Sequence, residues 1–192
     1  MIQTRKEQKF YINEDRKRNA IPQNWGRYVL RLLAGQENAA AFRYIKCMRY
    51  LEYHLNNSNR NCIHKLLFIY YKLKNSRMGL KYNLYIRPNT CGYGLRIMHL
   101  TGGGGVHLNI EKAGNYCGFN AGVLLGNKDT DDNRPTLGDH VAFGPGAKAF
   151  GKINIGNNVF VAPNAVVSKD VPADCVVGGV PAKIIKYKEK NV

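Results

Sequence analysis

Apolar residues in the first two-fifths of the chain recur at spacings of three and four, the pattern of a helix with one buried face. The spacing holds over residues 28–34 and 39–55, with arginine and lysine between the apolar positions. Asparagine and serine at 56–59 break the pattern, and a further apolar segment follows at 63–73. The sequence therefore predicts three helices over these three segments.

The pattern changes completely in the second half, where glycines are dense and β-branched residues dominate. From residue 137 an apolar residue recurs every six positions, and another small or branched residue follows four positions after each. The first series is Leu137, Phe143, Ala149, Ile155, Val161 and Val167, and the second is Val141, Ala147, Ile153, Val159, Ala165 and Val171. Ala113, Phe119 and Leu125 fall in the same phase, and a polar, acidic loop at 127–135 interrupts the series.

A period of six fits neither a helix nor a sandwich, and it indicates a solenoid whose units bury their apolar faces against neighbouring coils. Three sides of six residues complete one triangular coil, with the recurrent apolar residue pointing inward. An ordinary parallel sheet with chance spacing is the alternative, and six successive matches weigh against it. The sequence thus predicts a mainly β solenoid with an α-helical appendage.

Length and composition agree with this interpretation. A chain of 192 residues suits one domain with a small appendage, and 44% hydrophobic residues exclude a wholly disordered chain. No stretch is long and apolar enough to span a bilayer, and residues 1–10 are too polar for a signal peptide. The five cysteines share no CxxC spacing, so we expect reduced thiols in a cytoplasm rather than disulfides or a zinc site.

The net charge of +16 raises the question of a nucleic-acid partner. Residues 1–78 hold 16 lysines and arginines against five acidic residues, so most of the excess lies in the helical part. No helix-turn-helix, zinc-finger or RNP signature accompanies it, and we expect no nucleic-acid partner but a solvated basic face. Residues 64–74, apolar with basic flanks, either pack on their own domain, which we favour, or lie on an anionic membrane surface.

Residues 143–185, with the elements Lys-Asp-Val-Pro and Gly-Val-Pro-Ala-Lys, resemble the C-terminal part of hexapeptide-repeat acyltransferases. The element Gly-Tyr-Gly-Leu-Arg-Ile-Met-His at 92–99 is similar to the serine acetyltransferase branch. The resemblance implies a left-handed parallel β-helix over 79–185, preceded by a helical region over 1–78 and followed by a basic tail at 186–192. It also implies a homotrimer with sites between subunits, acetyl-CoA as donor and no required metal.

Transfer of an acetyl group to a hydroxyl needs a base, because an alcohol is a poor nucleophile at neutral pH. The resemblance assigns this role to His99, and an imidazole accepts a proton in that pH range. None of the five cysteines has an adjacent activating residue, so no cysteine nucleophile is expected. The four glycines at 102–105 either present amide groups to the reacting atoms or form a flexible bulge. His107 is a candidate acceptor-binding group or an ordinary edge histidine.

Three departures from the branch concern the acceptor. Met98 stands where the branch has an aspartate before the histidine, and residues 85–88 lack the carboxylate that orients the imidazole. Arg134 stands where the branch has a second histidine, and it suits an acceptor carboxylate or phosphate. A backbone carbonyl, or an aspartate of the 127–135 loop (Asp129, Asp131 or Asp132), is expected to orient His99 instead.

The CoA site is expected in a groove along one corner of the solenoid. Small residues there would admit the pantetheine arm close to the backbone, and two lysines in the family motifs would bind phosphates. The candidates are Gly144, Gly146, Ala147, Ala162, Pro163, Lys169 and Lys183.

The resemblance therefore implies an acetyl-CoA-dependent O-acetyltransferase. Because carboxylates that would pair with an ammonium are missing, the sequence favours a hydroxyl of a sugar or surface polysaccharide as the acceptor. L-Serine, as in cysteine biosynthesis, is the alternative acceptor. A non-catalytic β-helix scaffold, with basic helices that contact an anionic partner or a membrane, is an alternative of another class.

Overall fold

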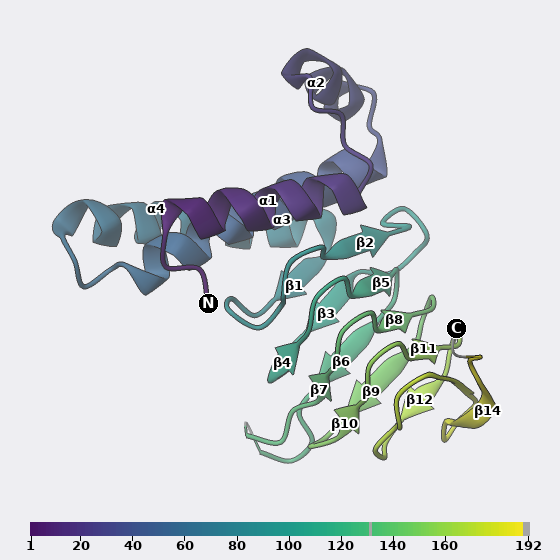
Figure 1. Cartoon of the computed structure of the whole chain (residues 1–192). Helices are drawn as coiled ribbons and strands as arrows, with labels where there is room; N and C mark the ends of the chain where they lie inside the picture. Colours follow the sequence, from purple (N-terminus) through teal and green to yellow (C-terminus); the bar gives the residue numbers. More distant parts are fainter. Residues whose placement is uncertain (131, 190–192) are drawn as a thin grey trace.

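The computed structural model describes residues 1–130 and 132–189, which form helices at one end of a parallel β-solenoid (Figure 1). The solenoid coils stack away from the helices, which leaves α1 and β14 at opposite ends of the molecule. The helices are α1 (Arg5–Arg18), α2 (Trp25–Leu33), α3 (Glu37–Asn56) and α4 (Cys62–Tyr82). No helix of the described residues combines the length and the apolar character needed to cross a membrane.

Three of these helices were predicted, and α1 was not. Its sequence has few apolar residues, and its start is fixed by a capping box in which Thr4 and Glu7 bond each other's backbone N–H groups. The predicted boundary after residue 78 falls inside α4, which continues to Tyr82 and ends at the left-handed Asn83. Position 79 of this helix requires glycine, because the side chain of any other residue would strike the carbonyl oxygen of Leu84.

The strands form three faces of the solenoid, and successive strands of the chain move from face to face. The five-stranded face comprises β1 (Leu84–Ile86), β3 (Val106–Leu108), β6 (Leu124–Gly126), β9 (Lys148–Phe150) and β12 (Val166–Val167). The six-stranded face comprises β2 (Arg96–Met98), β5 (Gly118–Asn120), β8 (Ala142–Phe143), β11 (Phe160–Val161), β13 (Cys175–Gly178) and β14 (Lys183–Tyr187). The three-stranded face comprises β4 (Lys112–Ala113), β7 (Thr136–Leu137) and β10 (Asn154–Ile155).

The six-residue period produces this architecture directly. Every member of both series is buried, so each coil contributes its recurrent residues to one continuous core. Neighbouring strands within each face are parallel, apart from the final pair of β13 and β14. The predicted class, a helical region followed by a hexapeptide-repeat β-helix, is confirmed.

The helices close the open end of the solenoid. Apolar residues of α3 and α4 join the solenoid core, and α3 packs on β2 while α4 packs on β1. At the centre of this contact, the fully buried Arg49 binds Asp15 of α1, Glu52 of α3 and the carbonyl oxygens of Cys91 and Gly92. At the other end, β14 folds back on β13, so the predicted tail from 186 begins within a strand, and 190–192 lie outside the described residues.

Candidate active site

His99 is the first residue after β2, where the chain turns from the six-stranded to the five-stranded face. Its backbone is left-handed (φ 59°), and its side chain is 65% exposed. The carbonyl oxygen of His99 accepts the N–H of Gly102 at 2.9 Å, which closes a tight turn. An exposed imidazole on a fixed turn is able to accept a proton from a bound hydroxyl.

A carboxylate does meet this imidazole, and it comes from the helical region. Glu37, in the first turn of α3, places Oε1 3.7 Å from Nδ1 of His99, and its Oε2 accepts the hydroxyl of Thr101 at 3.1 Å. Within one chain, Glu37 therefore stands where an aspartate of the 127–135 loop or a backbone carbonyl was expected. Asp129 and Asp132 lie at the next corner of the solenoid, and Asp131 lies outside the described residues. Glu37 is 62 positions from His99 in the sequence, and no local pattern marks it.

Two of the four glycines after His99, Gly104 and Gly105, are packed tightly against neighbouring backbone. A Cβ on Gly104 would lie 2.7 Å from the Cα of Gly122 in the next coil, and one on Gly105 would strike the carbonyl of Asn83. Only Gly103 of the four has open space around its Cα, and it needs a positive φ of 84°. These glycines therefore allow successive backbones to approach closely at this corner.

Most of the predicted CoA-binding residues continue the same corner. Gly122 lies over Gly146, Gly146 lies over Asn164, and Gly144 lies against the backbone of Pro163. Ala162 is half-buried and Pro163 exposed beside them. The structure thus brings Gly144, Gly146, Ala162 and Pro163 into one line with the turn at His99.

Three other predicted CoA residues are placed differently. The side chain of Ala147 is buried in the solenoid core, so it does not line a surface groove. Lys183 begins β14, directly after the last turn of this corner, and is exposed. Lys169 is exposed at the following corner, one face away from His99.

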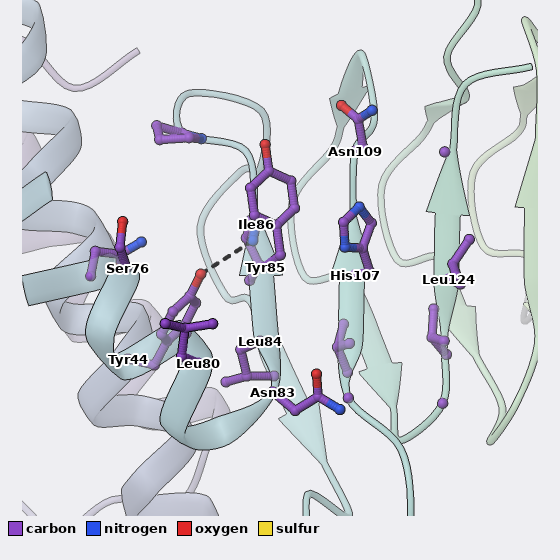
Figure 2. Close-up of a pocket in the computed structure, with 18 of the residues that line it drawn as sticks. Tyr44, Ser76, Leu80, Asn83, Leu84, Tyr85, Ile86, His107, Asn109 and Leu124 are labelled. Atoms are coloured by element: carbon purple, nitrogen blue, oxygen red, sulfur yellow. Dashed lines mark hydrogen bonds between the residues drawn. The ribbon is translucent and has the colours of Figure 1, made fainter. Parts of the chain in front are cut away.

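His107 projects from β3 into a cavity of about 1020 Å³ between the five-stranded face and α4 (Figure 2). Its ring stacks on that of Tyr85 from β1, with centroids 4.6 Å apart. Partial burial lowers the pKa of His107, so the ring is neutral at neutral pH. Gly105 and Gly122 also line this cavity, so it extends to the corner that holds His99.

Arg134 lies at the end of the 127–135 loop, where the chain turns from the five-stranded to the three-stranded face. Its guanidinium is 3.7 Å from Glu111, which also lies 3.9 Å from Arg87. Within one chain, the width of the five-stranded face separates Arg134 from His99. The two predicted site residues are therefore not brought together inside a single chain.

Four of the five cysteines are buried, and Cys62 is exposed. Burial raises the pKa of Cys91 to about 12 and that of Cys117 to about 11, and it also raises the pKa values of Cys47 and Cys175. Cys62 is exposed at the start of α4, remote in the chain from the His99 corner. Among the described residues, no three His, Cys, Asp or Glu side chains are grouped to hold a metal ion.

Comparisons with curated proteins find serine acetyltransferases. The chain is 32% identical over 183 residues to that of Buchnera aphidicola, an alignment that covers 91% of this chain and 64% of the relative. It is 42% identical over 96 residues to that of Synechococcus elongatus, covering 49% and 38%. The chain thus spans less than two thirds of the length of these relatives. No protein-family model matches it.

Solved structures show the same likeness. The serine acetyltransferase of Brucella abortus superposes with a TM-score of 0.70 at 25% identity, over 95% of this chain and 70% of that one. The same enzyme in complex with coenzyme A gives 0.69 at 25% identity, over 96% and 70%. The Neisseria gonorrhoeae enzyme in complex with serine gives 0.64 at 27% identity, over 93% and 69%. By sequence and by fold, this chain resembles the serine acetyltransferase branch of the hexapeptide-repeat acyltransferases.

Proposed function

We propose that this chain is an O-acetyltransferase that uses acetyl-CoA, with His99 as its general base. The observation that supports this most strongly is the exposed imidazole of His99, which lies beside Glu37 at a solenoid corner lined by small residues. The chain is also similar to serine acetyltransferases in sequence and fold. A related enzyme of this fold has been crystallised with coenzyme A, which supports the same donor here. We also propose a cytoplasmic location, which the five free cysteines support.

The proposed reaction is direct transfer within a ternary complex. His99 takes the proton of the acceptor hydroxyl while the hydroxyl oxygen attacks the thioester carbonyl of acetyl-CoA. The carbon–sulfur bond then breaks, CoA leaves as a thiolate, and the imidazolium returns the proton to that sulfur. The products are the O-acetyl ester and CoA with a free thiol. The Glu37 carboxylate faces this ring throughout, with Oε1 3.7 Å from Nδ1.

L-Serine is the acceptor that the comparisons favour. The relatives are serine acetyltransferases, and one of the similar structures holds serine. The sequence alone favoured a sugar hydroxyl, and the comparisons support its alternative better. Met98 stands beside His99 where the branch has an aspartate. The ammonium group of a bound serine would therefore be held by other groups than in the branch.

A sugar remains the second candidate because of the cavity beside the corner. Tyr85 and His107 present a stacked pair of rings to this cavity (Figure 2), and flat rings of this kind suit the apolar face of a sugar. Tyr85 occupies the position at which the branch carries its orienting carboxylate. This site would hold an acceptor larger than serine.

We also propose that the active unit is a trimer, with each site between two subunits. Arg134 and His99 lie at different corners of one chain, so Arg134 can bind an acceptor at His99 only from a neighbouring subunit. Gly144, Gly146, Ala162 and Pro163 would border the pantetheine arm, with Lys169 and Lys183 near the phosphates. Light scattering tests this assembly, since a trimer has three times the mass of the 21.6 kDa chain.

The deciding experiment is a CoA-release assay with a thiol reagent. Cys62 is exposed and would itself react, so the assay uses a Cys62→Ser background. Acetyl-CoA is supplied with L-serine or with a panel of hexoses and amino sugars. We expect release with L-serine, and a loss of roughly 10²-fold or more in kcat for His99→Ala. His140→Ala, another exposed histidine, is the matched control and keeps the full rate.

Each result separates one part of the proposal from the rest. Release with a sugar and none with serine overturns the acceptor and keeps the activity. A His99→Ala variant with the full rate overturns the base assignment. No release with any acceptor favours a scaffold without catalysis.

A further inference from the structure

Helix α4 is apolar on two opposite sides. One side packs against α3 and β1, with Tyr71 and Met78 contributing to the core that the helices share with the solenoid. The other side exposes Ile63, Leu66 and Leu73, whose side chains are 62%, 66% and 56% accessible. Ile69 and Tyr70 are exposed between them. Among the described residues, no element covers this outer side.

The outer side is a continuous stripe with basic borders. At 100° per residue, the five apolar residues from Ile63 to Leu73 fall within an arc of roughly 120°. Lys65 and Lys72 lie along one edge of this arc, and Lys74 and Lys81 along the other. Arg77 falls inside the arc itself, one turn beyond Leu73, and the 21 residues of α4 include no aspartate or glutamate. The stripe is therefore an apolar strip between two rows of positive charge.

Charge decides between the possible occupants of such a stripe. A second copy placed on it across a two-fold axis would bring the lysines of one α4 against those of the other. An anionic lipid surface complements both features, since acyl chains accept the apolar strip and headgroups pair with the lysines on either side.

We propose that α4 lies in the surface of an anionic membrane, parallel to it, with Ile63, Leu66 and Leu73 inserted among the lipids. This association would be peripheral and reversible, and it does not depend on the proposed catalytic function. α4 leads directly through Asn83 into β1, so the membrane would hold the first coil of the solenoid close to its surface.

The test is co-sedimentation of the full chain with phosphatidylcholine vesicles prepared with and without phosphatidylglycerol. We expect binding to the anionic vesicles that weakens as salt is raised, and far less binding to the neutral ones. The double variant Leu66→Ser/Leu73→Ser is expected to reduce partitioning at least about tenfold, because it removes two inserted side chains. The double variant Lys65→Glu/Lys72→Glu is expected to abolish the preference for phosphatidylglycerol.

Control variants distinguish binding through this surface from nonspecific adsorption to the vesicles. Leu33→Ser removes a still more exposed leucine from α2 and should leave vesicle binding unchanged. Circular dichroism and light scattering of each variant verify its fold and its mass. Equal binding to both vesicle types, or an unchanged partition of the Leu66→Ser/Leu73→Ser variant, overturns the proposal. A lower oligomeric mass for that variant also overturns it, because a second copy would then cover the stripe.

Discussion

The Oε1 atom of Glu37 lies 3.7 Å from Nδ1 of His99, and the other oxygen of the same carboxylate accepts the hydroxyl of Thr101. One side chain from the start of α3 thus contacts both the candidate base and the turn that carries it. The helical region consequently contributes a residue to the candidate site as well as closing the solenoid. In this chain it supplies the carboxylate that residues 85–88 lack.

Substitution of Glu37 is expected to slow acetyl transfer without unfolding the protein. Glu37→Ala removes both contacts and frees the His99 turn, and we expect kcat to fall roughly tenfold or more, since small errors in placement are costly. Glu37→Gln keeps an acceptor for Thr101 but loses the charge, so we expect a smaller fall. The CoA-release assay measures both, and the apparent KM for acetyl-CoA should change little.

The control for this pair is Glu7→Gln, which removes a carboxylate from the exposed start of α1. That variant weakens a helix cap and should leave kcat unchanged. Wild-type turnover by Glu37→Ala would show that the 3.7 Å contact has no role in positioning His99.

The glycine corner permits a comparison between crowding and backbone strain. Gly104→Ala puts a methyl group 2.7 Å from the next coil, whereas Gly103→Ala meets nothing but requires a positive φ. We expect Gly104→Ala to cost about 1–3 kcal/mol of unfolding free energy through overpacking, and also to lower kcat by displacing His99. Gly103→Ala should cost about 1 kcal/mol and change kcat less. Urea unfolding and the CoA-release assay provide the two measurements, and equal kcat losses would contradict a packed corner.

The solenoid was predictable because its six-residue period can be recognised from residues that are close together in the sequence. Leu137, Phe143 and Ala149 recur every six residues since each coil has three sides of that length, and each is buried in turn. His99 was singled out by the motif at 92–99, and the structure places it directly after β2. Features set by the repeat therefore needed no tertiary information.

The unpredicted features depend on contacts between distant segments. α1 has little apolar pattern of its own, and it is held by Asp15, whose carboxylate meets Arg49 and the N–H of Leu95. Glu37 reaches His99 only because α3 lies across β2. Neither pairing leaves a periodic signal, because a single polar contact fixes no spacing in either segment.

Breaking the buried network at Arg49 is expected to detach the helices from the solenoid. Arg49→Met leaves Asp15 and Glu52 as buried carboxylates without their cation, and we expect a loss of about 3–5 kcal/mol of unfolding free energy. Urea unfolding measures the loss, and limited proteolysis should cut the helical region first. Lys17→Ala, which removes an exposed ion pair with Glu14, should cost less than about 1 kcal/mol. Similar losses for the two variants would contradict a structural role for the network.

Stability is expected to fall in mild acid because of a histidine pair between α3 and α4. The Nδ1 atoms of His54 and His64 lie 3.0 Å apart, so one ring must donate and the other accept. Burial, aided by the charges of His64 and Arg5, lowers the pKa of His54. The unfolded chain then binds more protons than the folded one below the ordinary histidine pKa of about 6.5, so the unfolding free energy decreases as pH falls through that value.

The measurement is the urea midpoint at a series of pH values from about 8 to about 5, a range that is kept above the titration of most carboxylates. We expect His54→Gln to remove a large part of the pH dependence. His107→Gln should remove a smaller part, because burial shifts the pKa of His107 in the same direction. His140→Gln, at an exposed position, serves as the matched control for replacing a histidine. A midpoint that rises toward pH 5, or a His54→Gln variant with the full wild-type slope, would show that this pair does not couple folding to protonation.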